Sequence, residues 1–207
     1  MILKKALLSA ALLLGASSAA SATTVWATSV TDGITSCSVQ TNNGNRANMC
    51  NALGAADGDF SGGKGNGFTS SGKFTSLTFD FGTKFTGPVT FYEITGGSPT
   101  KHPEALTFSA VSVGGAIATG TVANTDPGAT KVAGTDARWQ IVFNGFDGRK
   151  FTSLTVTDNS NTADGFDIDA VSVIATMPLP AGAMLLLTGF GALAVARRRQ
   201  KGASSEV

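Results

Sequence analysis

Residues 74–81 read Phe-Thr-Ser-Leu-Thr-Phe-Asp-Phe, and over the second half of this stretch every other residue is apolar. Such alternation predicts a β-strand with one face on a hydrophobic core. The pattern returns at 139–143, where only Val142 is out of phase, and at 154–157. The segment Phe-Thr-Ser-Leu-Thr also recurs at 151–155, through internal duplication or equivalent strand chemistry. In either case we expect both copies to form core strands.

On both sides of this strand, short segments rich in Thr, Val and Phe are separated by turn signals containing Gly, Pro and Asp. Short strands at such spacing are typical of antiparallel sandwiches. We therefore predict an all-β fold, a single antiparallel β-sandwich with jelly-roll topology, over residues 23–176. The expected strands are 24–30, 74–81, 89–95, 105–113, 116–122, 138–143, 151–157 and 166–174.

The composition excludes several functional classes. The chain of 207 residues has a formal net charge of +1, which argues against a nucleic-acid-binding protein with a concentrated basic face. One His and two Cys are too few for a zinc cluster. Two of the 15 basic residues precede the segment 23–176 and four follow it, as does one of the 14 acidic residues. The segment itself therefore carries 9 basic and 13 acidic residues, a net charge of −4.

The N-terminus has the three parts of a secretory signal peptide. Lys4 and Lys5 precede a short apolar run, and Ala20-Ser21-Ala22 forms a small-residue cleavage site. The run is shorter than the roughly 20 residues that a membrane span requires. We expect residues 1–22 to form a helix that signal peptidase removes, with cleavage after Ala22 or, as a weaker option, after Ala19 or Ala20. The alternative is a buried N-terminal helix.

The C-terminus has a different three-part order. A Met-Pro-Leu-Pro-Ala segment at 177–181 precedes the apolar run 182–196, which is followed by a basic cluster. From Met177 the stretch is just long enough to span a bilayer as a helix. The basic cluster and the tail 202–207 should remain on the cytoplasmic side of the inner membrane. The sandwich should then lie on the opposite, non-cytoplasmic side. The short motif consists of Pro178, Leu179, Pro180 and Ala181, and the basic cluster of Arg197, Arg198, Arg199 and Lys201.

This order resembles the VPLPA-type sorting signal, a relative of the PEP-CTERM signals of Gram-negative bacteria, although Met177 stands where that family has Val. The resemblance covers 177–201 only. It implies recognition by an exosortase-type transpeptidase, export to the cell surface, and an association with exopolysaccharide or biofilm matrix. The membrane helix would then be a transient tether; the alternative is a permanent single-pass anchor.

Residues 42–72 lack sustained alternation and are rich in Gly, Asn and Ser. A long irregular segment of this kind is either functional or poorly ordered. Cys37 and Cys50 flank its beginning, and in an exported protein an isolated pair of cysteines is most simply a disulfide.

The densest acidic motif, Asp-Gly-Phe-Asp-Ile-Asp-Ala-Val, occupies 164–171. On a regular strand Asp167 and Asp169 share one face, and Val171 and Val173 fall on that same face unless a bulge intervenes. Carboxylates beside an apolar strip need a partner, and a calcium ion would supply one. A second acidic turn lies at 57–60. The candidate calcium ligands are Asp57, Asp59, Asp164, Asp167 and Asp169.

The combination of these two acidic motifs resembles galactose-binding-like surface β-sandwich modules. The resemblance implies a structural calcium ion that joins a loop to the end of a strand. The alternative is a solvated acidic turn followed by an ordinary edge strand.

No catalytic set is recognisable. His102 has no nucleophile elbow near it, and Glu93 and Glu104 are the only glutamates of the segment 23–176. We therefore predict a non-catalytic surface or matrix protein, with a carbohydrate-binding module as the alternative. Possible aromatic platforms for polysaccharide are Trp26, Tyr92 and Trp139, although Trp139 is in phase with core residues.

Overall fold

The computed structural model describes residues 21–41, 45–58, 68–95, 98–133, 138–146, 148–162 and 165–177. The strands belong to one compact unit, Thr23–Thr176, with short extensions at both ends. Of the predicted signal-peptide helix, residues 1–20 lie outside the described residues, whereas Ser21 and Ala22 belong to strand β1 (Ser21–Trp26) and not to a helix. The sorting motif, membrane helix, basic cluster and tail at 178–207 also lie outside the described residues. No helix within the described residues is long and apolar enough to cross a membrane.

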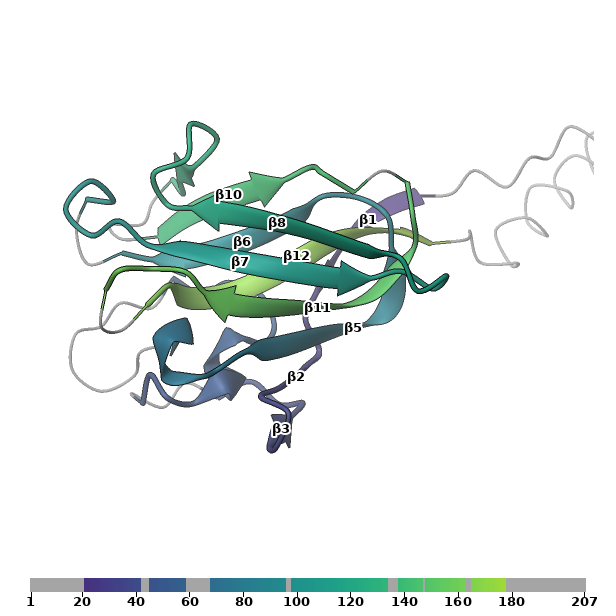
Figure 1. The fold of residues 1–207 in the computed structure, drawn as a ribbon, viewed down its shortest axis with the longest axis horizontal. Coiled ribbons are helices and arrows are strands. Elements are labelled where there is room, and N and C mark those ends of the chain that lie inside the picture. Colours follow the sequence, from purple (N-terminus) through teal and green to yellow (C-terminus); the bar gives the residue numbers. More distant parts are fainter. Residues whose placement is uncertain are drawn as a thin grey trace, which may run out of the picture. The chain divides into compact units, whose positions relative to one another are not determined.

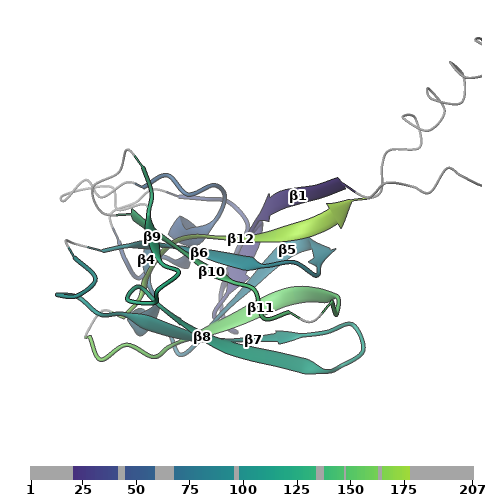
Figure 2. The same cartoon turned by 90° about the horizontal axis from the view of Figure 1, so that it is seen from above.

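Two six-stranded antiparallel sheets pack face to face, which confirms the prediction of an all-β sandwich (Figures 1 and 2). Sheet A has the order β1-β12-β6-β10-β9, with β4 also paired to β12, and sheet B has the order β3-β2-β5-β11-β7-β8. Sheet A contains β1 (Ser21–Trp26), β4 (Thr69–Ser70), β6 (Val89–Ile94), β9 (Thr130–Lys131), β10 (Arg138–Phe143) and β12 (Asp167–Met177). Sheet B contains β2 (Ser29–Thr31), β3 (Ser36–Cys37), β5 (Leu77–Phe85), β7 (Ala105–Val111), β8 (Ile117–Ala123) and β11 (Phe151–Asp158). Two 3-10 turns, η1 (Met49–Ala52) and η2 (Ser71–Lys73), lie between β3 and β5.

The predicted strand 24–30 is two strands in two different sheets. The Ala27 N–H donates to the carbonyl of Val171 in sheet A (3.0 Å), whereas the Thr28 N–H donates to the carbonyl of Asp80 in sheet B (2.9 Å). The chain thus crosses from one sheet to the other between consecutive residues. An apolar and polar pattern alone does not reveal the crossing, because both halves present their apolar residues to the same core.

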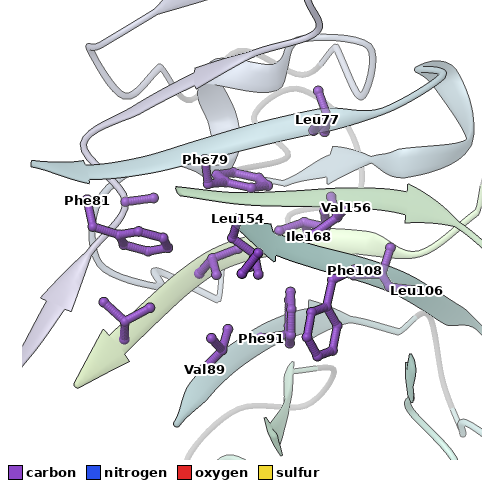
Figure 3. Packing of buried hydrophobic residues seen from close by; sticks show 14 of the residues in the cluster. Leu77, Phe79, Phe81, Val89, Phe91, Leu106, Phe108, Leu154, Val156 and Ile168 are labelled. Carbon is purple, nitrogen blue, oxygen red and sulfur yellow. The ribbon is translucent and has the colours of Figure 1, made fainter. Parts of the chain in front are cut away.

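The core lies between the two sheets and is dominated by phenylalanine (Figure 3). The alternation at 77–81 is confirmed, because Leu77, Phe79 and Phe81 are buried while Asp80 is exposed. The ring of Phe91 from sheet A lies 5.6 Å from that of Phe108 from sheet B, measured between centroids. Aromatic pairs that bridge the layers in this way contribute to the packing beyond the apolar area that they bury.

The outer face of sheet B carries one continuous row of hydroxyl side chains, which we call the hydroxyl row. Each strand of the sheet contributes one Ser or Thr, and neighbouring members are register partners. Two of them, Thr78 and Thr155, lie within hydrogen-bond distance (Oγ1 to Oγ1 2.9 Å). From edge to edge the row consists of Ser36, Thr31, Thr78, Thr155, Ser109 and Thr119.

Candidate functional site

A β-bulge near the beginning of β12 determines which way its aspartates face. Ile168 pairs with Glu93 and Ala170 pairs with Tyr92, so Asp169 is an extra residue with no partner of its own in β6. Such a bulge shifts the alternation by one residue. As a result Ile168 and the valines at 171 and 173 all contribute to the core. Asp167 and Asp169 are nevertheless buried, which means that something covers the outer face of sheet A at this point.

The cover over Asp169 is the turn that follows η1. The Asp57 and Gly58 N–H groups donate to the two carboxylate oxygens of Asp169, at 3.4 and 3.1 Å. The Arg138 Nη1 atom lies 3.9 Å from Oδ2 of the same carboxylate. Burial raises the pKa of Asp169 to about 7, aided by the nearby charge of Asp57, while the Gly58 N–H and Arg138 act in the opposite direction. Asp169 therefore joins two segments that are far apart in the sequence.

Arg138 is the second element of this junction. Its Nη1 atom donates to the carbonyl of Ala56 (2.8 Å), so the same guanidinium contacts both the turn and the aspartate. The guanidinium carbon also lies 5.9 Å from the centroid of the Tyr92 ring. The planar, permanently charged guanidinium suits this combination of a carbonyl, a carboxylate and an aromatic ring.

Asp167 makes a corresponding junction two residues earlier. The Ser70 hydroxyl donates to its Oδ1 atom, and the Arg46 Nη1 atom lies 3.7 Å from Oδ2. The Arg46 guanidinium carbon lies 4.8 Å from the centroid of the buried Phe68 ring. Both aspartates are thus satisfied by donors from the segment that precedes β5. We call the covering segment, residues 45–58 and 68–73, the cap.

The cap is held in place by covalent and polar links. The predicted disulfide is confirmed: Cys37 and Cys50 are bonded, with a Cα to Cα distance of 5.9 Å. Asn51 is completely buried, and its side-chain amide donates to the carbonyls of Asn45 and Phe68, both at 3.2 Å. The long irregular segment of the sequence is therefore ordered over its described part.

The candidate calcium ligands are brought together only in part. Asp57 lies beside Asp169, and Asp167 lies two residues away on β12, whereas Asp59 and Asp164 lie outside the described residues. Among the described residues, no three His, Cys, Asp or Glu side chains are grouped to hold a metal ion. Asp167 and Asp169 already accept hydrogen bonds from Ser70 and Gly58 and lie close to the guanidinium groups of Arg46 and Arg138, which repel a cation. The described residues alone do not fit a calcium ion, and the calcium site stays a prediction.

A second group of buried polar side chains, which no sequence pattern predicts, lies at the end of β6. Glu93 lies on the core-facing side and is completely buried. The Thr95 hydroxyl donates to its Oε1 atom, and the Asn124 amide donates to the same atom at 3.3 Å. The Asn124 side chain also accepts the Glu104 N–H (3.0 Å). Burial raises the pKa of Glu93 to about 7, although the hydrogen bonds from Thr95 and Asn124 lower it.

Two of the predicted aromatic platforms lie together. Trp26 and Tyr92 are both partly buried, and their ring centroids are 5.2 Å apart with an interplanar angle of 43°. Tyr92 is the register partner of Ala170, beside Asp169, so this aromatic pair adjoins the Arg138 junction. Trp139 is the register partner of the core-facing Glu93 and is also partly buried, which agrees with a packing role for its ring.

An open groove of about 600 Å³ lies over β5 and β11 of sheet B. Its lining includes Asp80, Lys84 and Lys150 but no aromatic side chain.

No protein-family model matches the chain, and no curated protein matches it.

Proposed function

We propose that this chain is a non-catalytic exported protein of the cell surface or extracellular matrix, processed by an exosortase-type transpeptidase. The observation that carries the proposal is the order Pro-Leu-Pro-Ala, apolar run, Arg-Arg-Arg at 178–199, which follows β12 directly. Signal peptidase, the inner membrane and the transpeptidase are the expected partners, and an exopolysaccharide matrix is the expected destination.

Two features of the domain support export. The Cys37–Cys50 disulfide is the kind of bond that persists in oxidising compartments. The irregular segment also forms a cap over sheet A that the disulfide ties to β3, and small extracellular domains commonly use disulfides to supplement a small core. The expected jelly-roll or galactose-binding-like topology is part of this proposal and goes beyond the two-layer sandwich itself.

The test is the mass of the mature chain after cell fractionation. Loss of the segment that follows the Pro-Leu-Pro-Ala motif supports sorting, whereas its retention supports a permanent single-pass anchor. A Pro178→Ala/Pro180→Ala variant should abolish processing. Pro127→Ala, at an exposed turn of the sandwich, is the matched control and should be processed normally.

Carbohydrate binding is the second candidate, favoured by the Trp26–Tyr92 pair beside Arg138. An aromatic ring with adjacent polar donors can contact the apolar face and the hydroxyl groups of a sugar. A glycan array probed with the full chain tests this candidate. Trp26→Ala should abolish the signal and Trp139→Phe should leave it unchanged; no binding to any polysaccharide would favour a purely structural role.

A structural calcium ion also remains part of the proposal, with Asp59 and Asp164 as the ligands that would have to complete the site. Calcium titration monitored by thermal melting is the test. A rise in Tm that Asp59→Asn removes would support the site, and an unchanged Tm would exclude it.

A further inference from the structure

Strand β8 forms one edge of sheet B, and its outer side has no strand partner among the described residues (Figure 1). Two of the other edge strands, β3 and β9, have only two residues each. β8 has seven residues, Ile-Ala-Thr-Gly-Thr-Val-Ala, with no charge and no proline. Soluble proteins usually protect exposed edges with charges, proline, bulges or very short strands. β8 has none of these protections.

The hydrogen bonds at both ends of β8 show which backbone groups face the open side. The Ser112 N–H donates to the carbonyl of Ala116 (2.8 Å), and the Asn124 N–H donates to the carbonyl of Glu104 (3.0 Å). In the antiparallel register of β7 and β8, bonded pairs alternate with non-bonded pairs, so the even-numbered residues of β8 are bonded to β7. The backbone groups that point to the open edge belong to Ile117, Thr119, Thr121 and Ala123.

A local turn closes one end of this open edge. The Asp126 carboxylate accepts the Ala123 N–H (2.9 Å), and the Asp126 N–H donates to the Ala123 carbonyl (3.0 Å). Ala123 is therefore already satisfied. Ile117, Thr119 and Thr121 remain, each with one N–H and one C=O toward the open side. These three residues are arranged symmetrically about Thr119.

We propose that β8 pairs antiparallel with β8 of a second copy of this chain, with the two-fold axis at Thr119. In this register Thr119 lies opposite Thr119 of the second copy, and Ile117 lies opposite Thr121. Every open N–H of one copy meets an open C=O of the other, and no residue of the open segment is left over. The interface contains no like-charge contact, because β8 has no charged residue.

The side chains agree with this register. Thr119 is the end member of the hydroxyl row, so a two-fold axis at Thr119 continues the row across both copies. Ile117 and its register partner Val111 are 61% and 48% exposed, and Val113 in the adjoining turn is 60% exposed. Pairing covers part of this apolar surface. The proposal does not depend on export or sorting, since it rests on the edge strand alone.

Disulfide trapping of the full-length chain in mild detergent tests the register. Thr119→Cys should give a covalent dimer on oxidation, because its sulfur atoms meet across the axis at a Cα separation of about 5.5 Å. Thr121→Cys is the matched control on the same strand and face, and should give at least tenfold less dimer. Thr107→Cys, one strand inward on β7, should behave like Thr121→Cys. Equal yields from all three, or no dimer from Thr119→Cys, would overturn the proposal.

A second experiment disrupts the pairing between the two copies of β8 and keeps the hydrogen bonds between β7 and β8. A mixture of Ile117→Cys and Thr121→Cys chains should form a mixed disulfide dimer. Thr119→Pro in both chains removes the central open N–H and should lower the yield at least tenfold, while Thr119→Val should leave it unchanged. A thermal melt of each variant shows that the domain is folded. Undiminished cross-linking of the proline variant, or an adduct whose mass shows another protein, would contradict self-pairing.

Discussion

The outer faces of the two sheets both carry polar side chains, but these side chains are buried on sheet A and exposed on sheet B. On sheet A, Asp167 and Asp169 point away from the core and are buried under the cap, which supplies N–H, O–H and guanidinium groups, while Arg138 of β10 lies beside Asp169. On sheet B the corresponding face carries the hydroxyl row, and its charged side chains Asp80 and Lys84 are exposed to solvent. Buried charges therefore need matched donors, whereas exposed charges and hydroxyl groups can be satisfied by water.

The two faces should therefore differ in how much single side chains contribute to the stability of the domain. The face under the cap depends on a few long-range contacts, each of which joins residues from distant parts of the sequence. The open face depends on cross-strand neighbours with small polar side chains, such as Thr78 and Thr155, and pairs of this kind contribute little each. Substitutions on the first face should therefore have large effects on the free energy of unfolding, and matched substitutions on the second face small ones.

The largest effect is expected for Asp169→Ala. It leaves the Arg138 charge and the two cap N–H groups without their acceptor, and breaking a buried ion pair costs about 4 kcal/mol. For a domain of this size the Tm should fall by about 10 °C. Asp80→Ala, an exposed aspartate on sheet B, is the control and should cost at most about 1 kcal/mol. Equal losses would refute the contrast between the faces.

The next effect is expected for the double variant Cys37→Ala/Cys50→Ala. The bond closes a segment with a sequence separation of 13, and in the chain-entropy model it contributes about 3 kcal/mol. Urea unfolding of the variant should show a lower midpoint, matching the wild-type chain under reducing conditions. An unchanged midpoint would mean that the hydrogen bonds of Asn51 hold the cap without the disulfide.

A pH-dependent effect of about 3 kcal/mol is expected from Glu93. Its pKa in the folded domain is about 7, against 4.5 for the ordinary side chain, so the folded domain retains a proton that the unfolded chain releases. The free energy of unfolding should therefore fall as the pH rises from about 4.5 to 7 and stay low above that. The groups that face Glu93 also include Asp167, whose charge raises the pKa of Glu93, and Glu104, whose side chain forms a hydrogen bond that lowers it. Glu93→Gln should remove most of the slope; a slope unchanged in that variant would place the titration elsewhere, with Asp169 as the next candidate.

The smallest effect is expected for Thr155→Val in the middle of the hydroxyl row. It removes one hydroxyl contact with Thr78, and cross-strand pairs of this kind contribute about 0.5 kcal/mol. Thr157→Val, two residues along the same strand and exposed, is the matched control. A loss above about 2 kcal/mol would show that the row acts cooperatively rather than as independent pairs.

The alternation in the sequence predicted the long strands well. The bounds of β10 are those expected, and those of β5, β6, β7, β8, β11 and β12 differ by one to four residues. The strands β3, β4 and β9 were missed, because two residues are too few to show a period of two. The crossing at Ala27 was missed because the sequence pattern does not encode which sheet a residue joins.

The site was predicted less completely. The bulge at Asp169 was recognised as a possibility, yet the donors that satisfy Asp167 and Asp169 come from Arg46, Ser70 and Arg138, which no local pattern connects to them. The hydrogen bonds that Glu93 accepts from Thr95 and Asn124 could not be predicted for the same reason. Asn124 lies 31 residues away, in the turn after β8. Long-range polar contacts of this kind follow from the register of the sheets, not from spacing along the chain.

The position of β12 within sheet A has a consequence for the order of folding. β12 is the last strand to be synthesised, but it lies between β1, the first, and β6. Sheet A therefore cannot form completely until β12 has been synthesised. Until then β1 and β6, the two strands that pair with β12, each have an unpaired edge. Pairing between the two ends of a domain is slow, because the entropy of closing the whole chain is lost before the contacts form. Sheet A therefore stays incomplete until β12 is synthesised, whereas all the described strands of sheet B are already available by then.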